Sequence, residues 1–235
     1  MNGVFMNLHL LHTGPLAVNT YILPLSENEV LVIDPADCPF SQDEGSVISY
    51  LASKNLRPLA VLLTHGHFDH VSGLPFIKKS FPDIPVVIHK ADSAMIGKDS
   101  QVQQGKSLSQ MGFFEFLPFV SDLPGASAFL EDGKNLLEIL GNCECSSEAK
   151  KSLEDWQVLH TPGHTEGSCC LYNEKDLTLI SGDTLFYHSW GRTDLAGGSE
   201  RKIHQSLAKI AEYCEKKTRV YPGHDHAGFT LEENF

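Results

Sequence analysis

The feature that most constrains the fold is a set of short apolar runs that end in potential metal ligands. The first, at residues 61–64, leads into HGHFDH, which carries His65, His67, Asp69 and His70. Three further runs lead into TPGH, SGD and PGH, which end at His164, Asp183 and His224. A glycine precedes the final group of each of these three, and glycine lets the backbone turn sharply where a strand ends. The pattern predicts a fold that brings several strand ends to one point, since binding groups favour loops on a rigid scaffold.

Apolar segments with high β propensity recur along the chain, and helical patterns lie between them. The strand-like segments are NTYILPL, EVLVIDP, LAVLLTH, IPVVIHK, WQVLHTP, SCCLYN, LTLISGD and TRVYPGH. Helical spacing of apolar residues is present at 43–54, 70–80 and 199–217, and Ser199 suits the N-cap of the last. Strands and helices mixed in this way predict an α/β layered domain.

We expect one domain that spans residues 1–235. The chain is 41% hydrophobic, enough to bury a core, and no linker, repeat or low-complexity tract divides it. The segment at about 97–130 interrupts the pattern, because a polar, loop-like stretch there is followed by an aromatic one at 112–119. We interpret it as a longer loop that either forms a lid over the site or packs over a sheet edge, and packing is favoured.

Composition restricts the partners of the protein. A formal net charge of -12 disfavours nucleic acid and anionic membranes, since both bind basic surfaces. The chain lacks the run of about 18 apolar residues that a membrane-spanning helix needs. Residues 1–23 lack the basic and apolar regions of a signal peptide and instead predict a first strand pair. We therefore expect a small-molecule substrate and a cytoplasmic location, and the oligomeric state stays open.

The residue types at the strand ends indicate a centre with two metal ions. Imidazole and carboxylate groups suit zinc, iron or manganese, whereas closed structural zinc sites usually use thiolates. Seven such groups are too many for one tetrahedral ion, but they fit two ions about 3.5–4 Å apart. On extended chain His65 and His67 point the same way, and Asp69 and His70 then begin the next helix. An isolated HxH sequence would equally suit a hydrogen-bonded structural pair, but the other five groups argue against that interpretation.

On these motifs the chain resembles the metallo-β-lactamase superfamily, whose HxHxDH motif is matched at residues 65–70. The segments HTPGHTEGS and SGDTLFYHSWGRTDLAGGS resemble the glyoxalase II-like (hydroxyacylglutathione hydrolase-like) hydrolases in particular. The resemblance implies an αββα sandwich with the metals in a cleft at one edge of the paired sheets. It also implies ligands for two ions: His65, His67 and His164 for the first, Asp69, His70 and His224 for the second, and Asp183 as the bridge.

The resemblance implies a hydrolase with two Zn²⁺ ions, and iron or manganese are alternatives. Zinc lowers the pKa of bound water from 15.7 to about 7 and so supplies hydroxide at neutral pH. We expect Asp69 to orient this nucleophile as well as to bind the second ion. A thiolate leaves readily, so a thioester such as S-lactoylglutathione is the expected substrate. The alternatives are a mononuclear iron persulfide dioxygenase of the same superfamily, a lactone hydrolase and, from another class, a non-catalytic metal-binding module.

Other polar residues near the motifs have competing interpretations. His226, in GHDHAG, competes with His224 as a ligand, but the PGH resemblance favours His224 and leaves His226 at the rim. Asp34, in VIDPA, is expected to satisfy loop backbone near the site instead of binding metal. In GRTDL, Asp194 is expected to brace the loop, and Arg192 either joins that brace or binds an anionic substrate.

Overall fold

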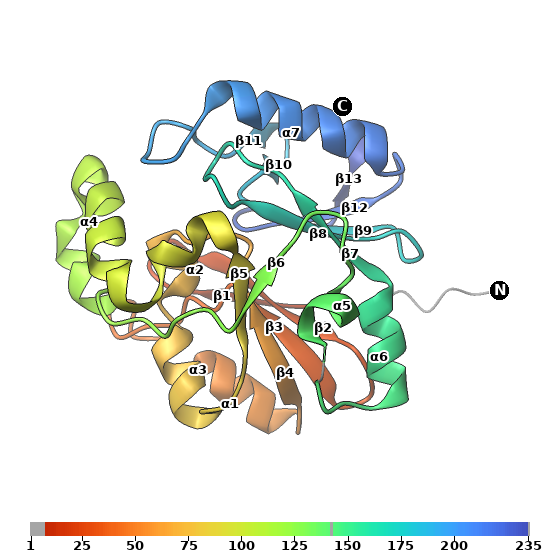
Figure 1. Ribbon diagram of the computed structural model, residues 1–235, viewed down its shortest axis with the longest axis horizontal. Coiled ribbons are helices and arrows are strands. Elements are labelled where there is room, and N and C mark those ends of the chain that lie inside the picture. Colours follow the sequence, from red (N-terminus) through yellow and green to blue (C-terminus); the bar gives the residue numbers. More distant parts are fainter. Residues whose placement is uncertain (1–7, 142, 235) are drawn as a thin grey trace.

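The computed structural model describes residues 8–141 and 143–234, and Figure 1 shows two β-sheets in it. The larger sheet has the strand order β1-β2-β3-β4-β5-β6. Its strands are β1 His9–Thr13, β2 Val18–Pro24, β3 Glu29–Ile33, β4 Arg57–Leu62, β5 Val86–His89 and β6 Ala128–Leu130. The first three strands pair antiparallel and the rest pair parallel. The expected first strand pair is β1 and β2, and residues 1–7 lie outside the described residues.

The smaller sheet has the strand order β13-β12-β9-β8-β7, and a two-stranded ribbon of β10 and β11 accompanies it. Its strands are β7 Trp156–His160, β8 Cys169–Asn173, β9 Thr178–Gly182, β12 Arg219–Pro222 and β13 Phe229–Thr230, and the ribbon is β10 Leu185–Phe186 with β11 Ser189–Trp190. β12 pairs parallel with β9, and the other neighbours pair antiparallel. Every strand-like segment predicted from the sequence is a strand in one of the two sheets.

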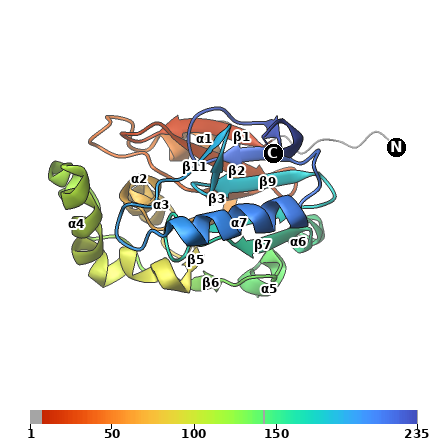
Figure 2. The same cartoon turned by 90° about the horizontal axis from the view of Figure 1, so that it is seen from above.

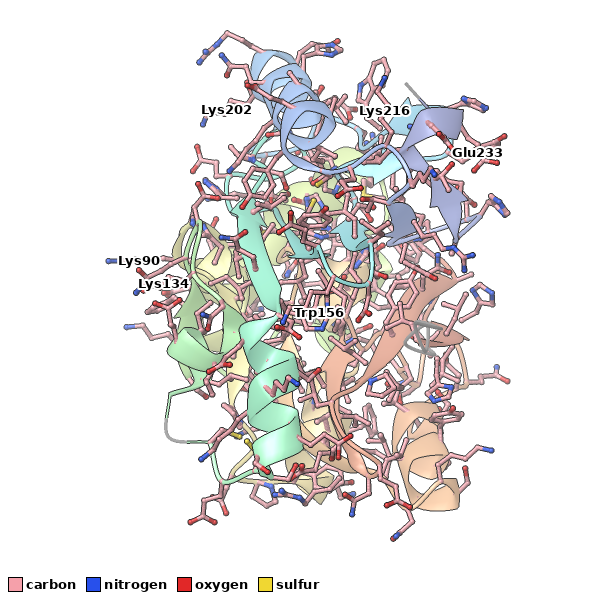
Figure 3. All side chains as sticks on the ribbon, turned by 90° about the vertical axis from the view of Figure 1, so that its right-hand side faces the viewer. Lys90, Lys134, Trp156, Lys202, Lys216 and Glu233 are labelled. Atoms are coloured by element: carbon pink, nitrogen blue, oxygen red, sulfur yellow. The ribbon has the colours of Figure 1, made fainter. Side chains whose placement is uncertain are left out.

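The two sheets pack face to face because side chains alternate along their strands. In β4, Ala60 and Leu62 join the buried cluster between the sheets, whereas Val61 joins the cluster on the outer face of the larger sheet. Trp156 is fully buried in the cluster between the sheets. Figure 3 shows its ring inside the molecule, while the labelled lysines and Glu233 lie at the periphery.

Helices cover the outer face of each sheet, as Figures 1 and 2 show. The α-helices are α1 Ser46–Ser53, α2 Phe68–Val71, α3 Leu74–Ser80, α4 Ser100–Met111, α5 Leu136–Leu140, α6 Ser147–Glu154 and α7 Glu200–Tyr213. The 3₁₀ helices are η1 Lys90–Met95, η2 Gly97–Asp99, η3 Phe114–Phe119 and η4 Leu231–Glu233. α1, α2 and α3 pack on the larger sheet and α7 packs on the smaller one. The expected αββα sandwich is therefore confirmed.

Two helices predicted from the sequence are present, one with its expected N-cap and one in two pieces. Ser199 caps α7, as predicted, because its side chain accepts a hydrogen bond from the backbone N–H of Lys202. The predicted helix at 70–80 is divided into α2 and α3. Within the part of the chain that the structure describes, no helix is both long and apolar enough to cross a membrane.

The segment at 97–130 differs from the loop expected for its polar part. Residues 100–111 form α4. Helical spacing of apolar residues is missing there because the buried positions of α4 include Ser100, Gln104 and Ser107 in place of a full apolar stripe. The aromatic stretch that follows forms η3, which buries one phenylalanine completely in the cluster outside the larger sheet.

Glu29, the first residue of β3, joins three parts of the chain. Its carboxylate accepts hydrogen bonds from the Ser26 hydroxyl at 2.9 Å and from the backbone N–H and hydroxyl of Ser146, and it pairs with Arg57 on β4. The Glu29 side chain is only 6% exposed. Burial opposes its ionisation, but the hydrogen bonds from Ser146, Ser26 and Arg57 outweigh burial and lower its pKa to about 2.

Glu29→Gln is expected to lower the free energy of unfolding at pH 7 by about 1–3 kcal/mol, since it removes the negative charge and one of the two acceptor oxygens that these donors share. The folded pKa lies below the unfolded value of 4.5, so the contribution of Glu29 is complete above that pH and disappears as the pH falls through about 2. Urea unfolding at pH 7 and pH 3 measures this difference, with the exposed Glu27→Gln as the control. An equal loss at both pH values would contradict the role of the ionised carboxylate.

Candidate metal centre

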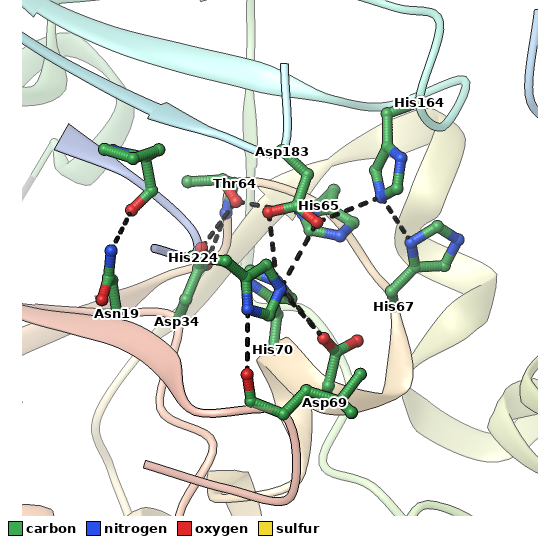
Figure 4. Close-up of polar contacts among 12 residues, drawn as sticks. Asn19, Asp34, Thr64, His65, His67, Asp69, His70, His164, Asp183 and His224 are labelled. Carbon is green, nitrogen blue, oxygen red and sulfur yellow. Dashed lines mark hydrogen bonds and ion pairs between the residues drawn. The ribbon is translucent and has the colours of Figure 1, made fainter. Parts of the chain in front are cut away.

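Loops at the carboxyl ends of four strands bring the predicted ligands together, as Figure 4 shows. The loop after β4 carries His65 and His67, and His67 is the N-cap of α2. The single turn of α2 holds Asp69 and His70, as the sequence predicted. The loops after β7, β9 and β12 supply His164, Asp183 and His224. All seven side chains therefore gather in one place, although they are spread over 160 positions of the sequence.

His65, His67 and His164 form the first group of potential ligands. One ring nitrogen from each lies within 4.8 Å of the others, and His67 Nδ1 is 2.8 Å from His164 Nε2. Burial lowers the pKa of His65 well below its usual value and that of His67 to about 3, and neighbouring histidines add to both effects. Both rings are therefore neutral at pH 7, which is the form that binds a metal ion.

Asp69, His70 and His224 form the second group. His224 Nε2 lies 3.2 Å from His70 Nε2 and 3.2 Å from Asp69 Oδ2. Burial opposes protonation of His70, but Asp183, Asp69 and Asp34 outweigh burial and raise its pKa well above the usual value. This group therefore attracts positive charge.

Asp183 lies between the two groups. Its Oδ2 is 3.5 Å from His164 Nε2 and 3.5 Å from His224 Nε2, and its Oδ1 is 3.4 Å from His70 Nε2. Burial opposes its ionisation, but His70, His65 and His164 hold the pKa of this carboxyl well below its usual range. An ionised carboxylate thus contacts both groups, which suits a bridging ligand.

Asp34 lies outside the second group and contacts one of its ligands, His70. Its Oδ1 accepts a hydrogen bond from the backbone N–H of Thr64 at 2.8 Å, as the sequence predicted, and its Oδ2 accepts one from the Thr64 hydroxyl at 2.6 Å. His70 Nδ1 also lies 3.0 Å from Asp34 Oδ2, a contact that the sequence did not indicate. Asp34, His65 and His70 could themselves hold an ion, but the carboxylate oxygens of Asp34 already have these partners. Asp34 therefore orients His70, as carboxylates behind metal-binding histidines commonly do.

Two glycines allow the loops to approach this closely. A Cβ atom on Gly223 would lie 2.2 Å from Asp183 Oδ1, and one on Gly191 would lie 1.9 Å from the backbone oxygen of Asp183. Any side chain at either position would displace Asp183, so the glycine of the PGH motif has a packing role beside its role in the turn.

The remaining candidates lie around the cluster. Arg192 donates two hydrogen bonds of 2.8 Å to the carboxylate of Asp194, which confirms the brace expected for Asp194. The backbone oxygen of Arg192 lies 2.8 Å from His164 Nδ1 and so fixes that ring. The ring of His226 packs near Tyr187, and His226 belongs to none of the ligand groups found among the described residues. His224 is the histidine that reaches the cluster.

A cleft of about 330 Å³ opens onto the metal-binding groups. Its apolar lining consists of Leu16, Phe68, Met111, Phe186 and Leu195. Its polar lining consists of His67, Asp69, His164, Asp183, Arg192, His224 and Asp225. Arg192 is the one lysine or arginine among the lining residues that the structure describes, and its guanidinium is already paired with Asp194.

The donor set fits two transition-metal ions. The buried atoms His65 Nε2 and Asp183 Oδ1 have no hydrogen-bond partner among the described residues, and buried polar atoms without a partner are rare unless an ion or water satisfies them. Two imidazole nitrogens that face each other at 2.8 Å likewise require a proton or a cation between or beside them. Nitrogen and oxygen donors of this kind suit zinc, iron and manganese.

Comparison with known proteins agrees with this geometry. The family described as the Metallo-beta-lactamase superfamily matches residues 13–142 and 147–224. The probable metallo-hydrolase YqgX of Bacillus subtilis is 32% identical over 216 residues, which cover 90% of this chain and 86% of YqgX. The hydroxyacylglutathione hydrolase of Pectobacterium carotovorum is 30% identical over 199 residues, which cover 84% of this chain and 59% of that enzyme.

Two solved structures resemble the whole chain. The structure of TTHA1623 in a di-iron-bound form has a TM-score of 0.71 and 29% identity, and the match covers 96% of each chain. The structure of the BLEG-1 B3 metallo-beta-lactamase has a TM-score of 0.77 and 29% identity, and the match covers 96% of this chain and 95% of BLEG-1.

Proposed function

Because the chain belongs to the metallo-beta-lactamase superfamily, we propose that it is a metal-dependent hydrolase and that its substrate is a thioester. The observation that carries the proposal is the convergence of seven histidine and aspartate side chains, five of which line one cleft. The proposed ligands are His65, His67 and His164 for one ion, Asp69, His70 and His224 for the other, and Asp183 for both. Two Zn²⁺ ions are proposed, and iron or manganese are alternatives with the same donors.

When bound, the ions would lower the pKa of a water molecule to about 7 and polarise the carbonyl of the substrate. The residues of the chain supply the rest of the chemistry. Asp69 lines the cleft as a buried carboxylate, and we propose that it accepts the proton of the attacking water and orients it. Asp34 and the backbone oxygen of Arg192 hold His70 and His164 in fixed orientations.

The cleft also supports the choice of substrate. A thioester needs little protonation of its leaving group, and the described lining residues offer metal-binding carboxylates and histidines but no lysine. The apolar lining suits a compact acyl or thiol group. A glutathione thioester carries carboxylates that would meet only Arg192, which Asp194 already occupies. We therefore propose S-lactoylglutathione as a substrate with a high KM and a neutral thioester as the better one.

The test is thiol release by zinc-reconstituted protein without oxygen. We expect cleavage of S-lactoylglutathione, and a lower KM for the lactoyl thioester of the neutral thiol N-acetylcysteamine. Metal-free protein is the control and is expected to be inactive. Iron-reconstituted protein is assayed in parallel for oxygen uptake with glutathione persulfide. Oxygen uptake without any zinc-dependent thiol release would replace the hydrolase with a dioxygenase and leave the fold and the ligand cluster unchanged.

A further inference from the structure

Asp92, in η1, contacts two separate loops of the first ligand group. Its Oδ2 accepts hydrogen bonds from the backbone N–H of Gly66 at 3.0 Å and from the Thr165 hydroxyl at 2.7 Å. Its Oδ1 accepts one from the backbone N–H of Gly167 at 2.7 Å. Gly66 separates the first two histidines of the group, and Thr165 directly follows the third. One buried carboxylate, 2% exposed, therefore ties together the loops that carry all three histidines.

The backbone packs closely around Asp92 and η1. A Cβ atom on Gly167 would lie 2.6 Å from Asp92 Cγ, and one on Gly66 would lie 2.7 Å from the Cβ atom of Met95. Both glycines thus let the backbone approach η1 closely. A carboxylate enclosed in this way fixes the spacing of its three donors, because interiors at this packing density transmit small displacements.

Gln104 bonds to the same loop through the other backbone group of Gly66, its carbonyl. Its side chain is fully buried on α4, and its Nε2 donates to the backbone oxygen of Gly66 at 2.7 Å and to that of Met95 at 2.8 Å. Both backbone groups of Gly66 are therefore bonded to side chains, the N–H to Asp92 and the carbonyl to Gln104. The connection ties α4, which lies in the segment expected to be a loop, to the strand-end that carries two candidate ligands.

We propose that Asp92 and Gln104 are positioning residues for the first metal site, in the way that Asp34 is for the second. This inference rests on the proposed function, because it takes the two ligand groups as two metal sites. Asp34 acts on a ligand directly, since its carboxylate lies 3.0 Å from His70 Nδ1. Asp92 and Gln104 act through the backbone on either side of the histidines. The hydrogen bonds found for Asp92 among the described residues all go to loops of the first group, so replacing Asp92 should weaken that site selectively.

The test measures zinc affinity at the two sites separately. Asp92→Asn keeps the shape of the side chain, but its amide group cannot accept from Gly66, Thr165 and Gly167 together. We expect zinc affinity to fall about 10–100-fold at the first site, which is the typical effect of losing a residue that supports the metal ligands from outside. Competition with chelators of graded affinity gives both constants. Asp99→Asn, at an exposed position near Asp92, is the matched control and should bind zinc like the wild type.

Cobalt(II) absorption identifies which site is affected. The spectrum of cobalt-loaded Asp92→Asn should match that of His67→Ala, which removes a ligand of the first group, and not that of His224→Ala, which removes one of the second. Equal weakening of both sites by Asp92→Asn, or unchanged affinity at both, would overturn the inference.

Gln104→Leu tests the inference from a second element, which matters if Asp92→Asn fails to fold. We expect a smaller loss of zinc affinity, about 10-fold, confined to the same site. Unchanged zinc affinity at the first site in this variant would overturn the role of α4. The wild-type protein separates this inference from the proposed function. Fewer than two zinc ions on the wild type would count against the dinuclear centre itself, whereas two tightly held ions in both wild type and Asp92→Asn would overturn only the positioning role.

Discussion

Asp183→Asn is expected to reduce thioester cleavage by about 1000-fold and to remove much of the bound metal. This is a larger effect than the roughly 10–100-fold loss that is typical when a residue hydrogen-bonded to a metal ligand is replaced. Asp183 contacts both ligand groups, with oxygens 3.4–3.5 Å from His70, His164 and His224. Burial opposes ionisation of its carboxyl, but His70, His65 and His164 hold its pKa low. Asparagine keeps the shape but offers a neutral amide with a single acceptor oxygen. Metal content per chain and kcat/KM on the same sample measure the two losses together.

His226→Ala is the matched control for this variant, since His226 lies in the same stretch as His224 but packs against Tyr187. We expect near wild-type metal content and activity from it. If His226→Ala and Asp183→Asn proved equally harmful, the assignment of the last ligand to His224 would be wrong.

The strands and the candidate site were predictable from the sequence because both depend on local patterns. Continuous apolar runs identified strands such as β4, and the short motifs after them placed His65, His164 and Asp183 at strand ends. Three of these strands, β7, β9 and β12, run in the same direction in the smaller sheet, but β4 lies in the larger one. Their convergence therefore also needs the face-to-face packing of two sheets, which only the family resemblance implied. Asp194 was predictable for a similar reason, because its partner Arg192 is two residues away.

The contacts that support the site were not predictable, because they join residues far apart in the chain. Asp92 bonds to Gly66 and Gly167 across 26 and 75 positions, and nothing in the sequence around it indicates a ligand or a cap. Gln104 was missed together with α4, because a helix that buries polar side chains for hydrogen bonding has no apolar periodicity. The buried polar residues of α4, among them the one that bonds to the loop of His65 and His67, are therefore also the reason that the helix was not predicted.

Removal of metal is expected to lower the melting temperature by at least about 10 °C. An ion that binds only the folded chain stabilises it by about 4 kcal/mol when its free concentration is 1000 times Kd, and each kcal/mol shifts Tm by about 2–4 °C in a domain of this size. The buried nitrogen of His65 and the close pair His67 and His164 are left without a cation when the metal is removed. Calorimetry with and without chelator measures the shift, and Asp183→Asn should show a smaller one. A Tm that is independent of chelator would contradict the metal centre.

The decrease in Tm that the chelator causes should also become larger as the pH rises from 6 to 8. In the metal-free protein, burial opposes protonation of His70, but Asp183, Asp69 and Asp34 raise its pKa well above 6.5. Protonation of His70 therefore stabilises the metal-free protein fully below about pH 6.5, and this stabilisation is lost as the pH rises through the raised pKa. A metal ion must displace the same proton, so metal binding strengthens with pH over the same range. Both effects come from the same proton: above about pH 6.5 the metal-free protein loses stability with rising pH, whereas the metal-loaded protein, in which His70 carries no proton, does not. A Tm difference that stays constant between pH 6 and pH 8 would show that His70 does not exchange a proton for a metal ion.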